Sequence, residues 1–424
     1  MFFNTQNKLE PVKTRIVIAG CGFGGIACAF ELKKRLGNAA RIIAIDRSES
    51  FDYHASLPEL VSSKVREGDI TIPYWPLFEK AGIEFVQSQI TGVDRKGKTV
   101  SAGGKKIKYD CLVLSLGSQT EFYGVPGAKE NSYEFKSWQD ALALRNHCIR
   151  LFETCSLVGK DTGATRVVVI GGGLTGVELV TDLGDLLRNV CERCKIPQAR
   201  REIVLIGRSE RLSVGFSEPA SAFAESYLKS RGISVMLGDP VVKVNKGEVV
   251  LQSGKKIRSM TIVWCAGIRP NGVVQKTAGG DYNPKCGLVL NKYLQCDGDP
   301  SIFALGDCGY CSAFEVQPIL TAWRAIEQAD YVSHNLCCHI KGEKDNRMMY
   351  APRIFPALIS LGRGMGLLCY EGMWKKGRHI AWLKKIMQHV HMARFRHNWE
   401  FLEYLDEFFI SALELAYFFK VRGK

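Results

Sequence analysis

Two glycine fingerprints constrain this chain of 424 residues more than any other feature. The first, G-C-G-F-G-G, occupies positions 20–25, and the second, G-G-G-L-T-G, occupies positions 171–176; each follows a short β-branched run. Glycines at these spacings permit a tight turn from strand to helix and let the backbone approach a pyrophosphate closely. The phosphates then lie at a helix N-terminus, where free N–H groups and the helix dipole favour negative charge. Two such motifs predict two bound dinucleotides, and therefore electron transfer between them.

Each fingerprint is expected to open a strand–turn–helix–strand unit of a doubly wound α/β fold. The first unit has three predicted elements: a strand over Arg15–Ala19, a helix from about Gly24 to Leu36 and a strand over Ile42–Asp46. The second unit repeats the order: a strand over Arg166–Ile170, a helix from about Thr175 and a strand over Ile203–Ile206. We therefore expect two Rossmann-like dinucleotide-binding domains, the second inserted in the first.

Three further apolar runs are predicted to be strands that end in glycine. They end at Gly117, at Gly267 and at Gly306-Asp307. Ligands of a doubly wound sheet bind beyond the carboxyl ends of the strands, so these glycines are expected to border the cofactors. Asp46 ends the second strand of the first unit. It follows the glycines by about 20 residues, where a carboxylate accepts a hydrogen bond from a ribose hydroxyl.

Composition and charge narrow the class of protein. A chain of 424 residues is too long for one hydrophobic core, so two or three domains are expected. The formal net charge is +14, but no basic block or nucleic-acid-binding module accompanies it, so no nucleic-acid partner is expected. Phosphate-rich cofactors and an anionic membrane surface fit this charge better, and a merely soluble basic surface is the alternative. The 15 cysteines are scattered and match no zinc module, so no metal site is expected.

The C-terminal part differs from the rest. From about Met373 the sequence is aromatic and basic, and we expect it to be helical. Its apolar run Phe408–Phe419 is too short to span a bilayer and contains Glu414. An amphipathic helix lying in the membrane interface fits this pattern, and a helix packed on the core or on a second copy is the alternative. Residues 1–13 lack the apolar segment of a signal peptide, so a cytosolic location is expected.

Taken in this order, the motifs resemble those of the two-dinucleotide-binding-domain flavoproteins. Within them the chain resembles the type II NADH dehydrogenases, which are single-subunit, membrane-bound NADH:quinone oxidoreductases. The resemblance extends from about Thr14 to Lys424, and four short segments point to it: Asp52–His54, Leu174–Val177 with Glu178, Ser360–Arg363 and Trp382–Lys385. It implies that hydride passes from NADH or NADPH to FAD, and that two electrons pass on to a quinone or another lipid-soluble acceptor, without proton pumping.

The resemblance also assigns roles to residues. Those expected to bind the two cofactors are Gly20, Gly22, Phe23, Gly24, Gly25, Asp46, Arg47, Gly117, Gly171, Gly173, Thr175, Gly176, Arg208, Gly267, Gly306 and Asp307. Glu178 matches a family glutamate near the flavin and is the candidate catalytic residue, for substrate contact or proton handling. An ordinary acid in the first turn of a helix is its alternative interpretation. Lys384 resembles a family lysine near the quinone entrance, with simple lipid contact as the alternative.

The implied domain order places FAD binding in residues 1–150 and 281–372, NAD(P)H binding in residues 151–280 and membrane-associating helices in residues 373–424. The protein is expected to be peripheral, at the cytoplasmic face of the cell membrane. The C-terminal helices leave a homodimer open.

Two positions depart from the family pattern. Gly207-Arg208 ends the strand after the second fingerprint, where the family usually has an acid that binds the ribose 2′-hydroxyl of NADH. An arginine there accommodates a 2′-phosphate, so NADPH is expected to be accepted, unless the arginine is exposed and binds nothing. Trp323 and Glu327 stand where the family has two glutamines near the quinone. An indole that stacks on a quinone ring and a tryptophan of the core both fit, which leaves the acceptor open.

Two other functions remain open at this point. Sulfide:quinone oxidoreductases share the fold but use a cysteine just after the second fingerprint, where this chain has Leu174-Thr175. The other alternative is a flavin-loaded redox sensor or interaction protein with little turnover, whose thiols would be Cys191 and Cys194.

Overall fold

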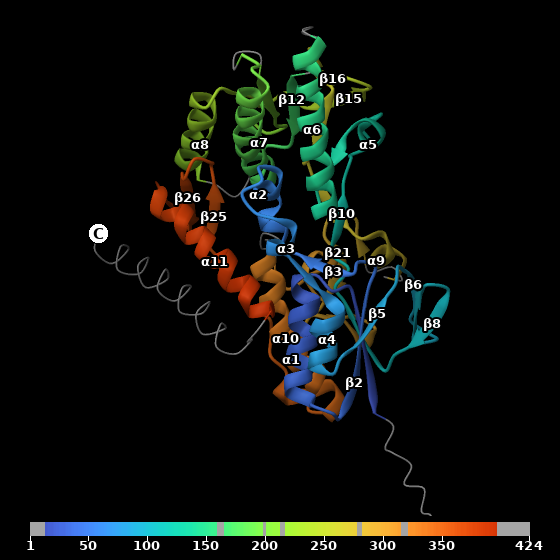
Figure 1. Ribbon diagram of the computed structural model, residues 1–424. Coiled ribbons are helices and arrows are strands. Elements are labelled where there is room, and N and C mark those ends of the chain that lie inside the picture. Colours follow the sequence, from blue (N-terminus) through green and yellow to red (C-terminus); the bar gives the residue numbers. More distant parts are fainter. Residues whose placement is uncertain are drawn as a thin grey trace, which may run out of the picture. The chain divides into compact units, whose positions relative to one another are not determined.

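The computed structural model describes residues 13–158, 165–197, 201–212, 217–277, 282–314 and 321–396. These residues divide into two compact units, whose elements are labelled in Figure 1. Unit 1 is drawn from the segments Met1–Phe51, Pro73–Gln119 and Arg269–Pro352, and unit 2 from Asp52–Ile72, Thr120–Ile268 and Arg353–Lys424. Each unit contains one fingerprint, and unit 2 interrupts unit 1 along the sequence.

Unit 1 is built on a sheet that is parallel at its centre. Within the described ranges its strand order is β20–β21–β22–β23–β9–β1–β2–β5, and β24 pairs with β21. The strands are β20 Tyr282–Asn283, β21 Gly287–Leu290, β22 Gln295–Cys296, β23 Asp299–Ala304, β9 Cys111–Leu114, β1 Thr14–Ala19, β2 Ala40–Asp46, β5 Glu84–Gln87 and β24 Gly309–Cys311. The strands from β23 to β5 are all parallel, so their carboxyl ends share one edge of the sheet.

Two long helices of unit 1, α1 (Phe23–Leu36) and α10 (Ala322–Lys341), lie side by side next to this sheet (Figure 1). Gly24 permits this approach, because a Cβ at that position would lie 2.9 Å from the carbonyl oxygen of Ala325. Strand β1 is apolar and fully buried from Ile16 onward, as a central parallel strand must be. The remaining elements of unit 1 are α4 Tyr74–Ala81, α9 Gly272–Thr277, η3 Gly306–Cys308, η4 Lys344–Asn346 and the small sheet of β6 Ile90–Asp94, β7 Thr99–Ala102 and β8 Lys105–Lys108.

Unit 2 contains a parallel sheet in the order β11–β18–β12–β13–β14. Its strands are β11 Tyr133–Glu134, β18 Thr261–Trp264, β12 Arg166–Ile170, β13 Glu202–Ile206 and β14 Ile233–Met236, and the helices beside them are α6 Trp138–Val158, α7 Leu174–Arg193 and α8 Glu218–Ser230. An antiparallel sheet of β15 Val241–Asn245, β16 Glu248–Leu251 and β17 Lys256–Arg258 shares a core with β12, β13 and β18. Alternate residues such as Val204 and Ile206 enter that core, because successive strand residues face opposite sides.

Unit 2 also holds the short helices of the segment 52–72 and the C-terminal part of the chain. These elements are η1 His54–Ser56, α2 Leu57–Val61, α3 Glu67–Ile70, α5 Ala128–Asn131, β25 Ala357–Ser360, β26 Gly366–Tyr370, β27 Met373–Gly377 and α11 Arg378–Arg396. Two pairs of short strands lie where the chain passes from one unit to the other: β3 Ser50–Asp52 with β4 Thr71–Pro73, and β10 Ser118–Thr120 with β19 Ile268–Pro270.

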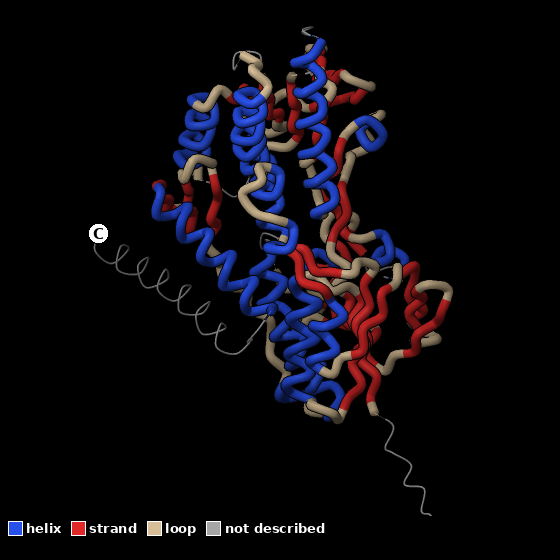
Figure 2. The backbone as a smooth tube through the Cα atoms, in the orientation of Figure 1, coloured by secondary structure: helices blue, strands red, loops and turns tan. Residues whose placement is uncertain are grey.

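The predicted strand–turn–helix–strand units are confirmed in both places. The expectation that helix begins at about Met373 is wrong, because residues Met373–Gly377 form β27 and the helix begins at Arg378 (Figure 2). Pairing with the apolar strand β26 overrides the local helical pattern there. No helix within the described ranges is long and apolar enough to span a membrane. The run Phe408–Phe419 lies outside the described residues.

Candidate functional site

The two fingerprints form turns with the same backbone geometry. Gly20 and Gly171 have positive φ angles of 100° and 128°, a region that favours glycine. A Cβ at Gly20 would collide with the carbonyl oxygen of Ser115, and a Cβ at Gly171 with that of Cys265. Each turn therefore lies against the chain that leaves the neighbouring strand of its own sheet, β9 in unit 1 and β18 in unit 2, with no room for a side chain.

The last glycine of each motif lets the helix pack onto the turn. A Cβ at Gly25 would collide with the carbonyl oxygen of the first glycine of its motif, and the same holds for Gly176. The two strand–helix junctions thus share their close contacts, and in both the helix begins directly against the turn.

The start of each helix offers free backbone donors. The N-cap residues of α1 and α7 are Gly22 and Gly173, no side chain caps either helix, and neither first turn contains an acidic residue. A Cβ at either N-cap would meet nothing within 4 Å. A helix N-terminus that no side chain caps, with open space beside its N-cap residue, fits a pyrophosphate. The residues present therefore fit one dinucleotide in each unit.

Hydrogen-bond register makes the two units comparable residue by residue. The first glycine of each fingerprint donates its N–H to the second strand, to Ile45 O at 2.8 Å in unit 1 and to Ile206 O at 2.7 Å in unit 2. The residues that follow, Asp46 and Gly207, are therefore structural equivalents. The first unit has a carboxylate at the position where the second has none.

The turn itself holds Asp46 in place. Its Oδ2 accepts a hydrogen bond from Cys21 N at 2.7 Å, and its Oδ1 accepts one from Ser48 N at 2.9 Å. Burial, and secondarily the charge of Asp46, raises the pKa of the Cys21 thiol well above its ordinary value. A carboxylate held by two backbone donors at the end of β2 fits the adenosine ribose of FAD.

The other predicted FAD residues lie at the carboxyl ends of β9 and β23. Asp307 accepts a hydrogen bond from Ser118 Oγ at 2.6 Å, and Gly306 N donates to Gln328 Oε1 at 2.7 Å. Gly117 follows β9 with a positive φ of 64°. Because β9, β23, β1 and β2 are neighbours in one parallel sheet, unit 1 brings these residues to a single edge.

Strand β13 of unit 2 ends without a carboxylate. A Cβ at Gly207 would lie 2.8 Å from Leu237 Cδ2 and 3.6 Å from the Cα of Gly172. Arg208 is exposed, and its guanidinium carbon lies 5.3 Å from the centre of the Tyr123 ring. A guanidinium that stacks on an aromatic ring is oriented but keeps its N–H donors available for a phosphate.

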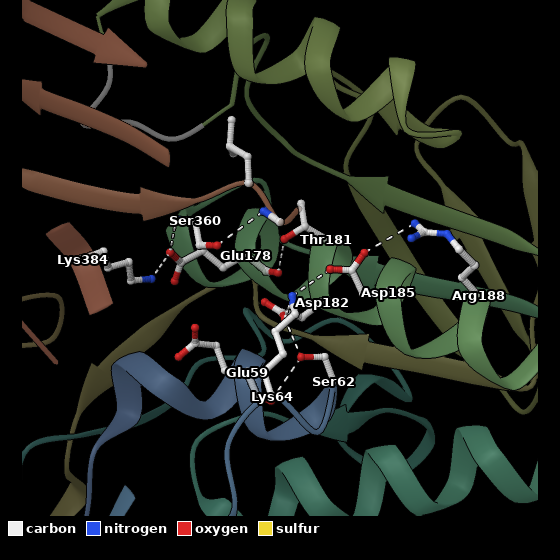
Figure 3. Close-up of polar contacts among 12 residues, drawn as sticks. Glu59, Ser62, Lys64, Glu178, Thr181, Asp182, Asp185, Arg188, Ser360 and Lys384 are labelled. Atoms are coloured by element: carbon white, nitrogen blue, oxygen red, sulfur yellow. Dashed lines mark hydrogen bonds and ion pairs between the residues drawn. The ribbon is translucent and has the colours of Figure 1, made fainter. Parts of the chain in front are cut away.

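Glu178 and Lys384 form a buried ion pair (Figure 3). Lys384 Nζ donates to Glu178 Oε1, and Ser360 N donates to the same oxygen at 2.7 Å. The two side chains are only 12% and 10% exposed, so the pair is largely shielded from water. Glu178 lies beyond the first turn of α7, so its interpretation as a first-turn acid is wrong. Unit 2 thus brings together side chains that lie 206 residues apart in the sequence.

Residues 14–330 match the family described as pyridine nucleotide-disulphide oxidoreductase. The chain belongs to this family. Each fingerprint turn, together with the helix start that follows it, is called a dinucleotide cradle: residues 20–25 form the first and residues 171–176 the second. An oxidoreductase of this kind requires two such cradles, one for each partner of the electron transfer.

Comparisons with individual proteins place this oxidoreductase more closely. The Type II NADH:quinone oxidoreductase of Staphylococcus epidermidis is 27% identical over 383 residues, which are 88% of this chain and 94% of the relative. The structure of NDH2 from Plasmodium falciparum in complex with NADH is similar with a TM-score of 0.79 at 19% identity, covering 91% of this chain and 99% of that chain. The sulfide:quinone oxidoreductase from Aquifex aeolicus gives a TM-score of 0.75 at 20% identity, covering 90% and 91%. The resemblance to type II NADH dehydrogenases is confirmed.

The predicted site residues of this oxidoreductase divide between the units. Unit 1 contains Gly20, Gly22, Phe23, Gly24, Gly25, Asp46, Arg47, Gly117, Gly306, Asp307, Trp323 and Glu327, and unit 2 contains Gly171, Gly173, Thr175, Gly176, Glu178, Arg208, Gly267 and Lys384. Within each unit the predicted cofactor residues follow adjacent strands of one sheet, in the order that the strand pairing sets.

Glu327 is engaged by its own helix and by a tyrosine of the same unit. Arg324 Nη1 donates to Glu327 Oε2 at 2.6 Å, and the Tyr350 hydroxyl donates to the same oxygen at 3.2 Å. Trp323 lies half-buried in the first turn of α10. Gln328, the residue after Glu327, accepts a hydrogen bond from the backbone of Gly306.

Several residues that share these contacts were not predicted from the sequence. They are Ser118, Tyr123, Gln328, Ser360 and the buried Glu59, Ser62 and Asp182. Gln328 could have been found, because it lies next to Glu327 in the segment that the resemblance singles out. Ser360 lies in the segment Ser360–Arg363 that the resemblance marks, although its contact with Glu178 was not predicted. The others come from loops or from segments that pack only in the folded chain, and no local pattern marks them.

The cysteines do not favour the alternative functions. Cys191 is buried, and burial raises its pKa, which disfavours the thiolate that a redox sensor needs. Leu174 and Thr175 open α7, so they occupy the place where a sulfide:quinone oxidoreductase has its cysteine. Within the described ranges, no group of three or more His, Cys, Asp or Glu side chains could hold a metal ion.

Proposed function

We propose that this protein is a peripheral membrane NAD(P)H:quinone oxidoreductase that depends on FAD. The observation that carries the proposal is the pair of equivalent dinucleotide cradles, each at an uncapped helix N-terminus. The likeness over most of its length to a Type II NADH:quinone oxidoreductase supports the choice of electron acceptor.

In this proposal unit 1 holds FAD. The backbone at the start of α1 binds the pyrophosphate, Asp46 binds the adenosine ribose, and Asp307, oriented by Ser118, binds the side of the flavin that carries the ribityl chain. When bound, FAD supplies the capacity to take a hydride from a nicotinamide and to release two electrons to an acceptor. This domain overlaps the expected segments 1–150 and 281–372, but their parts 52–72, 120–150 and 353–372 belong to unit 2.

Unit 2 holds the nicotinamide dinucleotide, through the backbone at the start of α7 and through the end of β13. We assign this role to the expected segment 151–280. Gly207 presents no carboxylate to repel a 2′-phosphate, and Arg208 offers donors to bind one. We therefore infer that NADPH is accepted as well as NADH.

Glu178 and Lys384 are the residues we assign to the acceptor side. A buried lysine that is bound to a carboxylate can orient and polarise a carbonyl oxygen of a quinone, and the ion pair offsets part of the cost of burying both charges. Trp323 remains a candidate for stacking on the acceptor. Glu327 has its carboxylate bound by Arg324 and Tyr350, which makes a positioning role in α10 the better assignment.

Membrane contact is assigned to α11 and to the segment 373–424 that contains it. Arg378, Trp382, Lys385 and His389 are exposed at helical spacing, so they share one face of α11, and the Trp382 side chain is 68% exposed. An exposed tryptophan among basic residues suits the headgroup region of an anionic membrane, which for a peripheral protein is the cytoplasmic face. A homodimer through the same face is the alternative occupant.

The experiment that tests the function is an anaerobic two-step reaction of the purified flavoprotein. NADPH or NADH should bleach the flavin absorbance, and a short-chain quinone should restore it without oxygen. Bleaching by sulfide alone would support the sulfide:quinone alternative, and a flavin that no donor bleaches would contradict the proposal.

For membrane contact, the double variant Trp382→Ala/Lys385→Ala should sediment less with anionic vesicles than Glu67→Gln, a control at an exposed position.

A further inference from the structure

The proposed function leaves one buried carboxyl group of unit 2 without a role. Glu59 lies on the short helix α2 and is only 7% exposed. Among the described residues no hydrogen-bond donor contacts its carboxyl oxygens, and in Figure 3 no dashed line reaches them. Burial of a carboxyl group without donors favours its protonated form and so raises its pKa.

The charges around Glu59 belong to the acceptor-side pair and its neighbours. Burial raises its pKa, Lys384 and Lys385 on α11 lower it, and Asp182 and Glu178 on α7 raise it. In Figure 3 the carboxyl group of Glu59 points toward the Glu178–Lys384 pair. A proton on Glu59 therefore faces the residues that we assign to the acceptor, and the charges of the two lysines favour the carboxylate that remains once the proton has left.

A second set of polar groups connects α2 with the solvent. Ser62 Oγ donates to Asp182 Oδ1 at 2.6 Å, and Lys64 Nζ donates to the same oxygen at 2.8 Å and to Asp185 Oδ2 at 2.7 Å. The Lys64 side chain is 32% exposed, whereas the Asp182 side chain is 1% exposed. Asp182 Oδ2 is buried and has no hydrogen-bond partner in the described part of the chain. The set thus starts at the surface and ends at a buried acceptor atom.

The proposed reaction requires a proton that the donor does not supply. Oxidation of NADPH or NADH releases a hydride, which carries two electrons and one proton. Reduction of a quinone to a quinol takes two electrons and two protons, so each turnover consumes one proton from outside. In a site shielded from water this proton must come from a side chain.

We propose that Glu59 donates this proton to the quinone, and that Ser62, Asp182 and Lys64 form the route by which a proton from solvent returns to Glu59. In each turnover the O–H bond of the Glu59 carboxyl group breaks and an O–H bond of the quinol forms, which leaves Glu59 as a carboxylate beside Lys384. A solvent proton then restores the carboxyl group. The inference rests on the proposed function and names the proton donor of its acceptor step.

The test compares two acceptors in the variant Glu59→Gln. Ferricyanide takes electrons without protons, whereas a short-chain quinone needs the proton. Glutamine matches the protonated glutamate in shape but donates no proton in this pH range, so quinone reduction should fall about 100-fold. Ferricyanide reduction and flavin bleaching by NADPH should stay at the wild-type rates. Glu67→Gln, in the same segment but exposed, should leave all three rates unchanged.

The pH profile separates a proton donor from a structural residue. Only the protonated form donates, so the wild-type quinone rate should fall as pH rises through the raised pKa of Glu59, and the variant should lack this fall in rate.

Thermal unfolding measures the protonation of Glu59 without depending on activity. The protonated form of Glu59 is favoured in the folded state, so its contribution to stability is lost as pH rises through that pKa. The melting temperature of Glu59→Gln should therefore rise relative to wild type as pH increases.

The rates with the two acceptors test the proton-donor role of Glu59 and the proposed function separately. Unchanged quinone reduction in Glu59→Gln, or an equal loss with quinone and with ferricyanide, would overturn the proton-donor role and leave the proposed function intact. A wild-type protein that reduces ferricyanide but no quinone would overturn the proposed function and, with it, this inference.

Discussion

The two cradles share their backbone geometry and differ in the residue that ends the second strand. Both have a first glycine with positive φ, a last glycine in contact with the first, and a helix that begins without a cap. At the end of the second strand, however, unit 1 has Asp46 and unit 2 has Gly207. The comparison teaches that the glycine pattern specifies that a dinucleotide binds, whereas the residue at the strand end specifies which ribose it carries.

The difference has electrostatic consequences on both sides. Asp46 accepts two backbone hydrogen bonds and so holds a fixed negative charge beside its cradle. An arginine follows in both cradles, Arg47 in unit 1 and Arg208 in unit 2, so the second cradle has the positive charge without the carboxylate. A ribose hydroxyl suits the first arrangement and a ribose phosphate suits the second.

The largest effects should follow from filling the close contact in each cradle. In Gly25→Ala and Gly176→Ala the new Cβ meets backbone, which cannot give way, so each unit should lose about 3 kcal/mol of stability. If the units have separate roles, Gly25→Ala loses bound flavin, and Gly176→Ala keeps flavin but is no longer bleached by NADPH. Flavin absorbance after gel filtration and anaerobic bleaching measure the two losses. Loss of flavin from Gly176→Ala alone would break the assignment of FAD to unit 1.

The next effect should come from giving the second cradle the acid of the first. In Gly207→Asp a carboxylate faces the 2′-phosphate, so the ratio of kcat/KM for NADPH to that for NADH should fall about 100-fold. The new side chain meets only the movable end of Leu237, so the fold should tolerate it. Arg208→Ala should weaken NADPH about tenfold and NADH little. A wild-type enzyme that favours NADH more than tenfold would refute the inference from Gly207-Arg208.

Removal of the acid from the first cradle gives a smaller effect of a different kind. Asp46→Ala loses a carboxylate that binds two backbone donors, so the dissociation constant of FAD should rise about 10-fold to 100-fold. The ratio of NADPH to NADH use should not change. Flavin release during dialysis measures the first quantity and steady-state kinetics the second. A change in cofactor preference would show that the two cradles are not independent.

The smallest effect should follow from removing the ring under Arg208. Exposed cation–π contacts contribute about 0.5–1 kcal/mol, so Tyr123→Leu should raise KM for NADPH only about twofold to fivefold. KM for NADH should stay the same, since NADH has no phosphate for Arg208 to bind. An equal rise for both cofactors would assign Tyr123 to the dinucleotide as a whole.

Much of the fold and of the cofactor sites could be predicted from the sequence, because these features depend on local rules. The turn at Gly20 and the strand over Arg166–Ile170 lie where the motifs predict them. Strand ends such as Gly117 and Gly306 follow from the rule that parallel strands share a ligand-binding edge. In each case steric limits on the backbone act within a few residues.

The acceptor side was less predictable, because its residues meet only after folding. The sequence alone assigns no partner to Glu327 and leaves Lys384 between quinone contact and lipid contact. The hydroxyl of Tyr350 engages the first, and Glu178 pairs with the second in a site shielded from water. No periodicity marked Glu59, because α2 is too short to carry a hydrophobic pattern.

The sequence by itself determined that this chain forms two dinucleotide cradles, since glycine conformation and strand–helix order are encoded locally. It also determined the chemical contrast between Asp46 and Gly207-Arg208. Only the tertiary structure decided that these two positions are equivalent, through the register of β1 with β2 and of β12 with β13. It alone decided as well that α2, α7 and α11 gather lysines and carboxyl groups into one buried cluster (Figure 3). Side chains so far apart in the chain are brought together by packing, which no local rule specifies.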